Sequence, residues 1–132
     1  MLEAAADENE RGEYSVRFTQ EALPRFDWRI MLREMKADMD AGVSAAAAAA
    51  KFMNTLCTMA LESCRMAREK TGLERVVLSG GSFQNMYIMH RLPELLRRDG
   101  FEVYHHSRVS PNDEGISLGQ LMIAAHRGRK RG

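Results

Sequence analysis

The chain has 132 residues, of which 45% are hydrophobic and 28% charged, and its formal net charge is +1. This composition predicts one globular domain and excludes a disordered or fibrous protein. The small net charge offers no long-range attraction to nucleic acid or to an acidic membrane, and the basic end at residues 127–131 has no aromatic side chain for base stacking. No apolar run approaches the ~20 residues of a membrane span, and the acidic start differs from a signal peptide. We therefore expect a cytoplasmic protein with neither nucleic-acid nor membrane partners.

The first predicted unit is an N-terminal segment over residues 1–26, followed by a single α/β lobe over residues 27–132. Within the first segment, residues 14–18 alternate apolar and polar side chains as an edge strand does. From Asp27 onward, apolar residues recur at steps of three and four. This spacing predicts an amphipathic helix with Asp27 as its N-cap and Gly42 at its end.

A second, longer helix is predicted from Ser44, its N-cap, through an alanine-rich stretch to about Lys70, with Gly72 closing it. Its apolar face is wide, so we expect it to be buried on more than one side. Cys57 and Cys64 share that face but lie about 10 Å apart along the helix axis. That separation is too large for a disulfide, and both are expected as thiols in the core.

Two strands and two more helices complete the predicted order. Residues 75–79 are a short β-branched run, typical of a strand buried on both faces of a parallel sheet. A helical stripe follows from Asn85, and Pro93 should cause a kink or a new first turn. After Gly100, residues 101–105 form the second strand, and a last helix runs from about residue 115 to 126. This order predicts a right-handed β-α-β crossover with parallel strands.

Two glycine-bearing loops, at residues 78–85 and 111–120, follow the two predicted strands. Ligands of parallel sheets bind beyond the carboxyl ends of the strands, so both loops should face one crevice. A glycine turn that leads into a helix directs backbone N–H groups and the positive end of the helix dipole at one spot, which favours a phosphate. The first loop has neither Gly-Lys-Ser/Thr nor Gly-x-Gly-x-x-Gly, which excludes the P-loop and the Rossmann fingerprint.

Each loop has a structural interpretation beside the functional one. Gly80 and Gly81 would let a ligand approach the backbone closely, and Gln84 and Asn85 offer amide groups, but a tight turn with positive φ explains a glycine pair equally well.

In the second loop, Asn112 and Asp113 fit an Asx turn and helix cap. Asp113 also fits a ligand for a divalent metal or for a ribose hydroxyl, and one carboxylate does not decide between them. His105 and His106 point to opposite faces of a strand, so we do not expect them to share a metal.

Three segments of the sequence stand out together: VVLSGGSFQN at residues 76–85, FEVY at 101–104 and SPNDEGISLGQ at 110–120. With these segments the chain resembles the C-terminal part of the HypF carbamoyltransferases, and the resemblance extends upstream over nearly the whole chain. The sequence departs from the family at Met53, where histidine is common, and at Ser82, where valine is usual.

The resemblance implies an α/β fragment of an actin, sugar-kinase and Hsp70-like (ASKHA) lobe, with helices packed on a small sheet. It implies transfer of a carbamoyl group from carbamoyl adenylate to the C-terminal cysteine of HypE, during nickel–iron hydrogenase maturation. ATP or carbamoyl adenylate and a divalent metal are the implied cofactors. By this resemblance Asp113 is the catalytic and metal-binding residue, and the nucleotide contacts are Gly80, Gly81, Phe83, Gln84, Asn85, Asn112 and Gly115.

The sequence lacks other parts that the family carries, namely a His-x-x-x-His metal pair, zinc-finger cysteines, an acylphosphatase-like segment and an adenylating module. We therefore expect a fragment that is inactive alone and that partners the remaining HypF modules and HypE. Its exposed lobe face invites a homodimer. Two alternatives remain open: a non-catalytic scaffold or docking module whose loops are only turns, and a lobe of an enzyme similar to the threonylcarbamoyl transferases.

Overall fold

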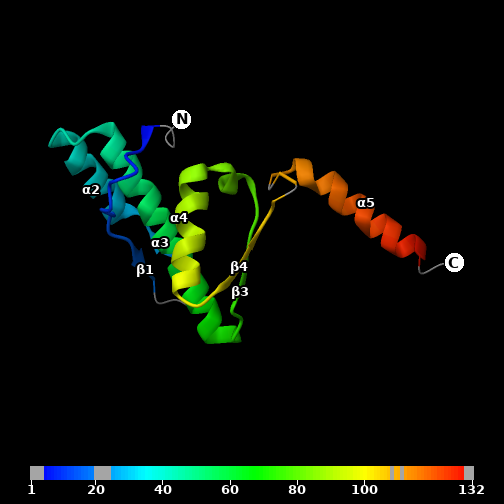
Figure 1. Cartoon of the computed structure of the whole chain (residues 1–132). Helices are drawn as coiled ribbons and strands as arrows, with labels where there is room; N and C mark the ends of the chain where they lie inside the picture. Colours follow the sequence, from blue (N-terminus) through cyan, green and yellow to red (C-terminus); the bar gives the residue numbers. More distant parts are fainter. Residues whose placement is uncertain (1–4, 20–24, 108, 111, 130–132) are drawn as a thin grey trace.

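The computed structural model describes residues 5–19, 25–107, 109–110 and 112–129. Helices and two small sheets make up the mixed α/β architecture that the sequence predicts (Figure 1). In chain order the elements are β1 (Arg17–Phe18), β2 (Phe26–Asp27), α2 (Arg29–Asp40), α3 (Ala45–Thr71), β3 (Arg75–Leu78), the 3-10 turn η1 (Gly81–Gln84), α4 (Met86–Arg98), β4 (Glu102–His105) and α5 (Glu114–Arg129).

The long helix α3 is the centre of the molecule. Ser44 caps it as predicted, since its Oγ accepts a hydrogen bond from the Ala47 N–H at 3.1 Å. Gly72 ends it with a left-handed backbone (φ 69°), the conformation that favours glycine. The wide apolar face is buried along most of its length, including Met53, as the pattern predicts. α4 packs along α3, and α2 crosses its N-terminal half (Figure 1).

The N-terminal segment lies against α3 through two buried polar residues. Asn54 Nδ2 donates to the carbonyls of Glu10 and Gly12, at 3.2 and 2.9 Å. Thr55 Oγ1 accepts from the Tyr14 N–H at 2.8 Å. Both side chains are almost completely buried, and these bonds satisfy polar groups that would otherwise be costly there.

The start of α2 corrects two sequence predictions. Trp28, not Asp27, is the N-cap residue; Asp27 lies in β2, although its Oδ1 still accepts from the Arg29 N–H at 3.1 Å. The predicted edge strand is limited to Arg17–Phe18, which pairs antiparallel with β2. The rings of Phe18 and Phe26 pack against each other at this strand pair, with centroids 4.3 Å apart and planes tilted by 54°.

The unit β3-α4-β4 is a parallel crossover, as predicted, with Leu78 opposite His105 at the carboxyl ends of the strands. One face of this two-stranded sheet packs on α3 and α4. The core there comprises Cys57, Leu61, Leu78, Leu92, Leu96 and Phe101. The prediction of burial on both faces is wrong, because Val77 and Tyr104 on the other face are 68% and 48% exposed. A β-branched run in the sequence does not indicate whether helices cover one face of the sheet or both faces.

Pro93 lies inside α4, and the helix does not begin anew there. Of the two predicted alternatives, the new first turn is therefore wrong, and the kink stays a prediction. Proline removes one intrahelical hydrogen bond. Pro93 is buried together with Leu92 and Leu96, and this packing against α3 holds the helix through the missing bond. Gly100 follows with φ 91° and ends the segment as predicted.

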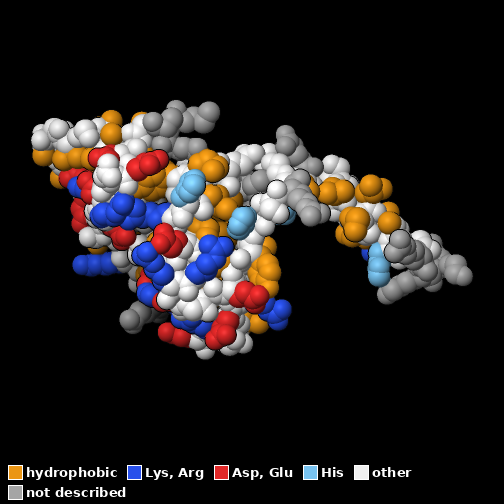
Figure 2. Space-filling view, in the orientation of Figure 1, with side chains coloured by type: hydrophobic (Ala, Val, Ile, Leu, Met, Phe, Trp, Pro, Cys, Tyr) orange, Lys and Arg blue, Asp and Glu red, His pale blue; other side chains and the backbone are white. Residues whose placement is uncertain are grey.

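The last helix, α5, extends away from the rest of the molecule (Figure 1). Its apolar side chains are exposed, and Figure 2 shows hydrophobic atoms gathered along it while charged side chains gather over the body. Those 45–65% exposed are Ile116, Leu118, Leu121, Met122 and Ile123. Among the residues described, none of the helices is long and apolar enough to cross a membrane.

Candidate functional site

The two predicted loops meet at the carboxyl ends of β3 and β4. Because Leu78 pairs with His105, the next residues of each strand, Ser79 and His106, lie side by side. Ser79 Oγ and His106 Nε2 share a hydrogen bond of 3.0 Å. Gln84 Nε2 in the first loop donates to Ser110 Oγ at the edge of the second, at 3.3 Å. The parallel sheet thus brings together two segments that are about 30 residues apart in the sequence.

A cavity of about 410 Å³ opens between these loops and the start of α5. Its size is within the range of small-molecule sites in proteins. It is lined by Ser79, His106, Val109, Ser110, Asn112, Gly115, Ile116, Leu118, Gly119 and Met122. Two residues predicted as nucleotide contacts, Asn112 and Gly115, therefore face the same cavity as the end of β3.

The two glycines of the first loop differ in their structural need for glycine. Gly80 has φ 108° and ψ 164°, a backbone conformation that residues other than glycine rarely adopt. Gly81 has no positive φ, and a Cβ added to it would meet nothing within 4 Å. The turn therefore explains Gly80 but not Gly81, whose missing side chain leaves the start of η1 open to an approaching molecule.

The other predicted contacts in the first loop already have structural roles. Asn85 is the N-cap of α4, since its Oδ1 accepts from the Ile88 N–H at 3.1 Å. Its Nδ2 donates to the sulfur of buried Met53 at 3.6 Å. Phe83 packs against the core cluster and does not line the cavity between the loops. Gln84 is exposed and keeps its amide at the junction of the two loops.

In the second loop, Gly115 is required by packing. A Cβ at this position would approach the Ser110 carbonyl oxygen to 3.0 Å and Val109 Cγ1 to 3.4 Å. Asp113 is exposed immediately before α5, and its carbonyl accepts from the Ile116 N–H at 3.0 Å. A carboxylate at a helix N-terminus is favoured by the helix dipole, which is the structural interpretation of this residue.

The described part of the chain contains no group of three His, Cys, Asp or Glu side chains arranged to hold a metal ion. Asp113 is therefore not part of a three-residue metal site within the described part of the chain. The cysteines do not offer a nucleophile here. Cys57 is buried in the core, and desolvation raises the pKa of its thiol to about 11; burial also raises the pKa of Cys64.

Sequence reasoning missed the residues that join the loops, namely Ser79, His106 and Ser110. The signal was present in the strand ends. Aligning residues 75–78 with 102–105 places Ser79 beside His106, and a parallel pairing of equal length brings the following residues together. The Gln84–Ser110 bond depends on loop conformation, which no residue pattern specifies.

Comparisons with known proteins give one consistent result. The family model described as "Carbamoyltransferase, Kae1-like Domain, second subdomain" matches residues 1–120. Carbamoyltransferase HypF of Synechocystis sp. is 29% identical over 96 residues, covering 73% of this chain and 12% of the relative. Carbamoyltransferase HypF2 of Cupriavidus necator is 38% identical over 90 residues, covering 67% of this chain and 11% of the relative.

A solved structure, full-length HypF in its phosphate- and nucleotide-bound form, is 41% identical and similar in fold, with a TM-score of 0.86. The match covers 93% of this chain and 16% of the solved one. The chain thus spans about one-eighth of the length of the two curated relatives.

Proposed function

Because the chain belongs to the HypF carbamoyltransferase family, we propose that it contributes one wall of the carbamoyl-transfer site in a longer enzyme. In this proposal the chain is part of one lobe of an ASKHA fold. The module passes a carbamoyl group from carbamoyl adenylate to the C-terminal cysteine of HypE, whose product serves nickel–iron hydrogenase maturation. The structurally similar full-length HypF was solved in a phosphate- and nucleotide-bound form, which supports nucleotide binding by the longer enzyme.

The observation that carries the proposal is the meeting of two loops at one cavity. A lone glycine turn is weak support for a ligand, but here the loop after β3 and the loop after β4 are joined by the Ser79–His106 and Gln84–Ser110 hydrogen bonds. The carboxyl ends of parallel strands are where ligands of such sheets bind. Gly81 does not line the cavity itself, but it follows Ser79 and Gly80 in the same loop, and a Cβ added to it would meet nothing within 4 Å.

The reaction asks this wall to bind and orient the adenylate. The thiolate of the acceptor attacks the carbamoyl carbon, a C–S bond forms, the C–O bond to phosphate breaks, and AMP leaves with the electron pair. Gly80, Gly81 and Gln84 hold the nucleotide, and closure of the site keeps water from hydrolysing the intermediate. Asp113 contributes a carboxylate beside the leaving phosphate or its ribose, as the resemblance implies.

A divalent metal would neutralise the phosphate charge that develops as AMP leaves. The described residues do not form a complete metal site, since no group of three His, Cys, Asp or Glu side chains among them could hold an ion. Any metal in the complete module takes most of its ligands from outside the described residues.

The test uses a full-length HypF in which this chain replaces the matching segment. Asp113→Ala should abolish formation of the thiocarbamate on HypE, detected by intact-protein mass spectrometry, while leaving the thermal midpoint unchanged. Transfer at the unaltered rate would show that Asp113 has no catalytic role.

A matched glycine pair tests the nucleotide wall in the same hybrid enzyme. Gly81→Ala should weaken ATP binding by about tenfold or more, which is about 1.4 kcal/mol. Gly128→Ala is the control, because its added Cβ also meets nothing within 4 Å but lies at the far end of α5. Equal ATP affinity in both variants would contradict the nucleotide site and favour the alternative of a docking module whose loops are only turns.

A further inference from the structure

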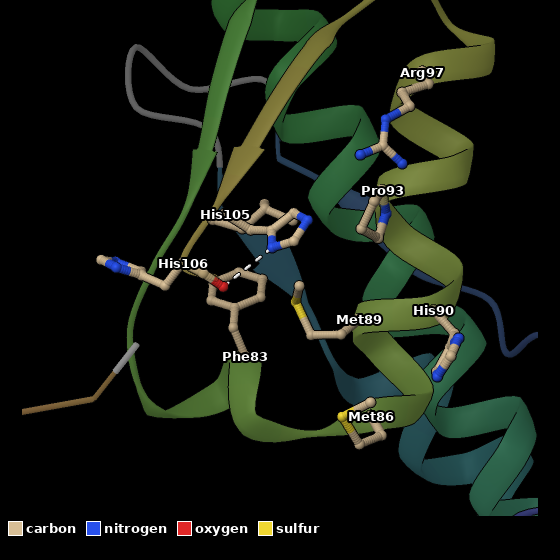
Figure 3. A pocket seen from close by; sticks show the side chains of 9 residues that line it. Phe83, Met86, Met89, His90, Pro93, Arg97, His105 and His106 are labelled. Carbon is tan, nitrogen blue, oxygen red and sulfur yellow. Dashed lines mark hydrogen bonds between the residues drawn. The ribbon is translucent and has the colours of Figure 1, made fainter. Parts of the chain in front are cut away.

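A second cavity, of about 390 Å³, lies between α4 and the carboxyl end of the sheet (Figure 3). Only His106 belongs to both this cavity and the one between the loops. Its lining combines apolar and basic side chains and contains no acidic residue. It is formed by Leu78, Phe83, Met86, Met89, His90, Pro93, Arg97, His105 and His106.

Two basic side chains face each other across this cavity. Figure 3 shows Arg97, from α4, and His105, from β4, pointing toward one another, with Phe83 and Met89 beneath them. His105 Nδ1 is 3.2 Å from the His106 carbonyl, which can only accept, so Nδ1 carries the hydrogen and Nε2 remains on the side of Arg97. His106 turns away from the cavity toward Ser79.

The guanidinium of Arg97 has no partner among the described residues, in contrast to three other arginines near the end of α4. Arg98, the next residue, pairs with Glu94. Arg65 and Arg68 both pair with Asp99. Arg97 is exposed at the mouth of the cavity and forms no ion pair or hydrogen bond through its side chain there. Its donors are therefore available to a ligand.

We propose that this cavity binds a small organic anion, with its carboxylate or phosphate on Arg97 and its apolar body over Phe83 and Met89. A guanidinium presents paired N–H donors that match the two oxygens of either group. An apolar floor with few polar groups at the rim is the usual composition of a small-molecule site, and the volume lies within the usual range. This site adjoins the cavity between the loops and shares His106 with it, but the anion proposal does not depend on the function proposed for that cavity.

The first experiment titrates the 132-residue chain with four probes. Binding is measured by isothermal calorimetry and by the NMR signals of His105 and Met89. The probes are 3-phenylpropionate, phenyl phosphate, the neutral alcohol 3-phenylpropanol and inorganic phosphate. At least one of the two aromatic anions should bind saturably and shift both signals, and the tighter of them identifies the anionic group. The alcohol and inorganic phosphate should each bind at least about tenfold more weakly than the better aromatic anion. The alcohol lacks the anionic group, and inorganic phosphate lacks the apolar body.

The second experiment compares two neighbouring arginines. Arg97→Gln should weaken the better aromatic anion about tenfold. Arg98→Gln is the matched control, because it removes the same charge from the same helix turn but does not line the cavity, and it should change affinity less than twofold. Met89→Gln should also weaken binding, because it replaces part of the apolar floor with an amide.

Three results would overturn the proposal. The first is the absence of saturable binding by both aromatic anions. The second is equal affinity for the anion and the alcohol, which would leave an apolar hollow without anion recognition. The third is an equal effect of Arg97→Gln and Arg98→Gln, which would reduce the interaction to the general positive charge at the end of α4.

Discussion

The body of the molecule, formed by α3, α4 and their sheet, and the terminal helix α5 have similar apolar side chains in opposite surroundings. Leu92 and Leu96 of α4 are essentially inaccessible to solvent, whereas Leu121 of α5 is 65% exposed. Both segments form helices of more than a dozen residues. The difference shows that helix formation and burial are separate properties of a sequence.

The two helices also differ in how their apolar residues are spaced. α4 has one apolar face, which contains Leu92 and Leu96 and packs on α3. In α5 the run from Leu121 to Ile123 continues around the helix, so no single face carries the apolar residues. A helix without tertiary packing is marginal at this length in water. We therefore expect the body to unfold as one cooperative unit in which α5 takes little part.

The largest effect should come from emptying the core of the body. Leu96→Ala should lower the free energy of unfolding by about 2–5 kcal/mol, because it removes a fully buried side chain and leaves a cavity. Leu121→Ala in α5 should change it by about 0.5 kcal/mol or less. Urea denaturation of both variants measures the loss of unfolding free energy. Similar losses in the two variants would contradict the distinction between the body and α5.

A smaller effect should follow from the ion-pair cluster that ties the end of α4 to α3. Asp99 accepts hydrogen bonds from Arg65 at 3.0 Å and from Arg68 at 2.8 Å, and the Arg65 bond is the main cause that lowers the pKa of Asp99. A lowered carboxyl pKa stabilises the fold above the unfolded pKa of about 3.9, and this contribution is lost as the pH falls through the folded pKa.

Asp99→Asn should therefore lower the thermal midpoint at pH 7, by less than Leu96→Ala does. The gap between the variant and the original chain should narrow as the pH falls below about 4. Thermal scans by circular dichroism from pH 7 to pH 2 follow both quantities. A gap that stays constant over this range would assign the loss to packing and not to the charge of Asp99.

The smallest effect on global stability is expected from a glycine inside α5. Gly119→Ala should favour the helix locally by about 0.5–1 kcal/mol, since alanine is the better helix former and the added Cβ meets nothing within 4 Å. The Cα chemical shifts of α5 should become more helical while the urea midpoint of the body stays the same. A midpoint that rises by the full local amount would place α5 inside the cooperative unit.

Local signals predicted the elements of this fold well. The cap at Ser44, the glycine ends at Gly42, Gly72 and Gly100, and the parallel pairing of β3 with β4 all agree with the structure. These features depend on neighbouring residues or on chain order alone. The bare outer face of the sheet and the exposed α5 could not be predicted, because burial depends on which other segments reach a surface.

The candidate site shows the same limit. The meeting of the two loops was predicted from strand direction, and their hydrogen bonds confirm it. The roles of Asp113, Gly81 and the other nucleotide contacts stay predictions, as does a homodimer through the exposed faces. The structural use of Asn85 as a cap and of Gly115 for close packing depends on contacts that a residue pattern does not contain.

The two buried polar residues of α3, Asn54 and Thr55, also connect segments that are far apart in the sequence. The Tyr14 N–H donates to Thr55, 41 positions later, and the Gly12 carbonyl accepts from Asn54, 42 positions later. The hydroxyl of Tyr87, in α4, donates to Oδ1 of the same Asn54 side chain at 2.7 Å. The buried Asn54 side chain thus joins the N-terminal segment and α4 to α3 through its own hydrogen bonds.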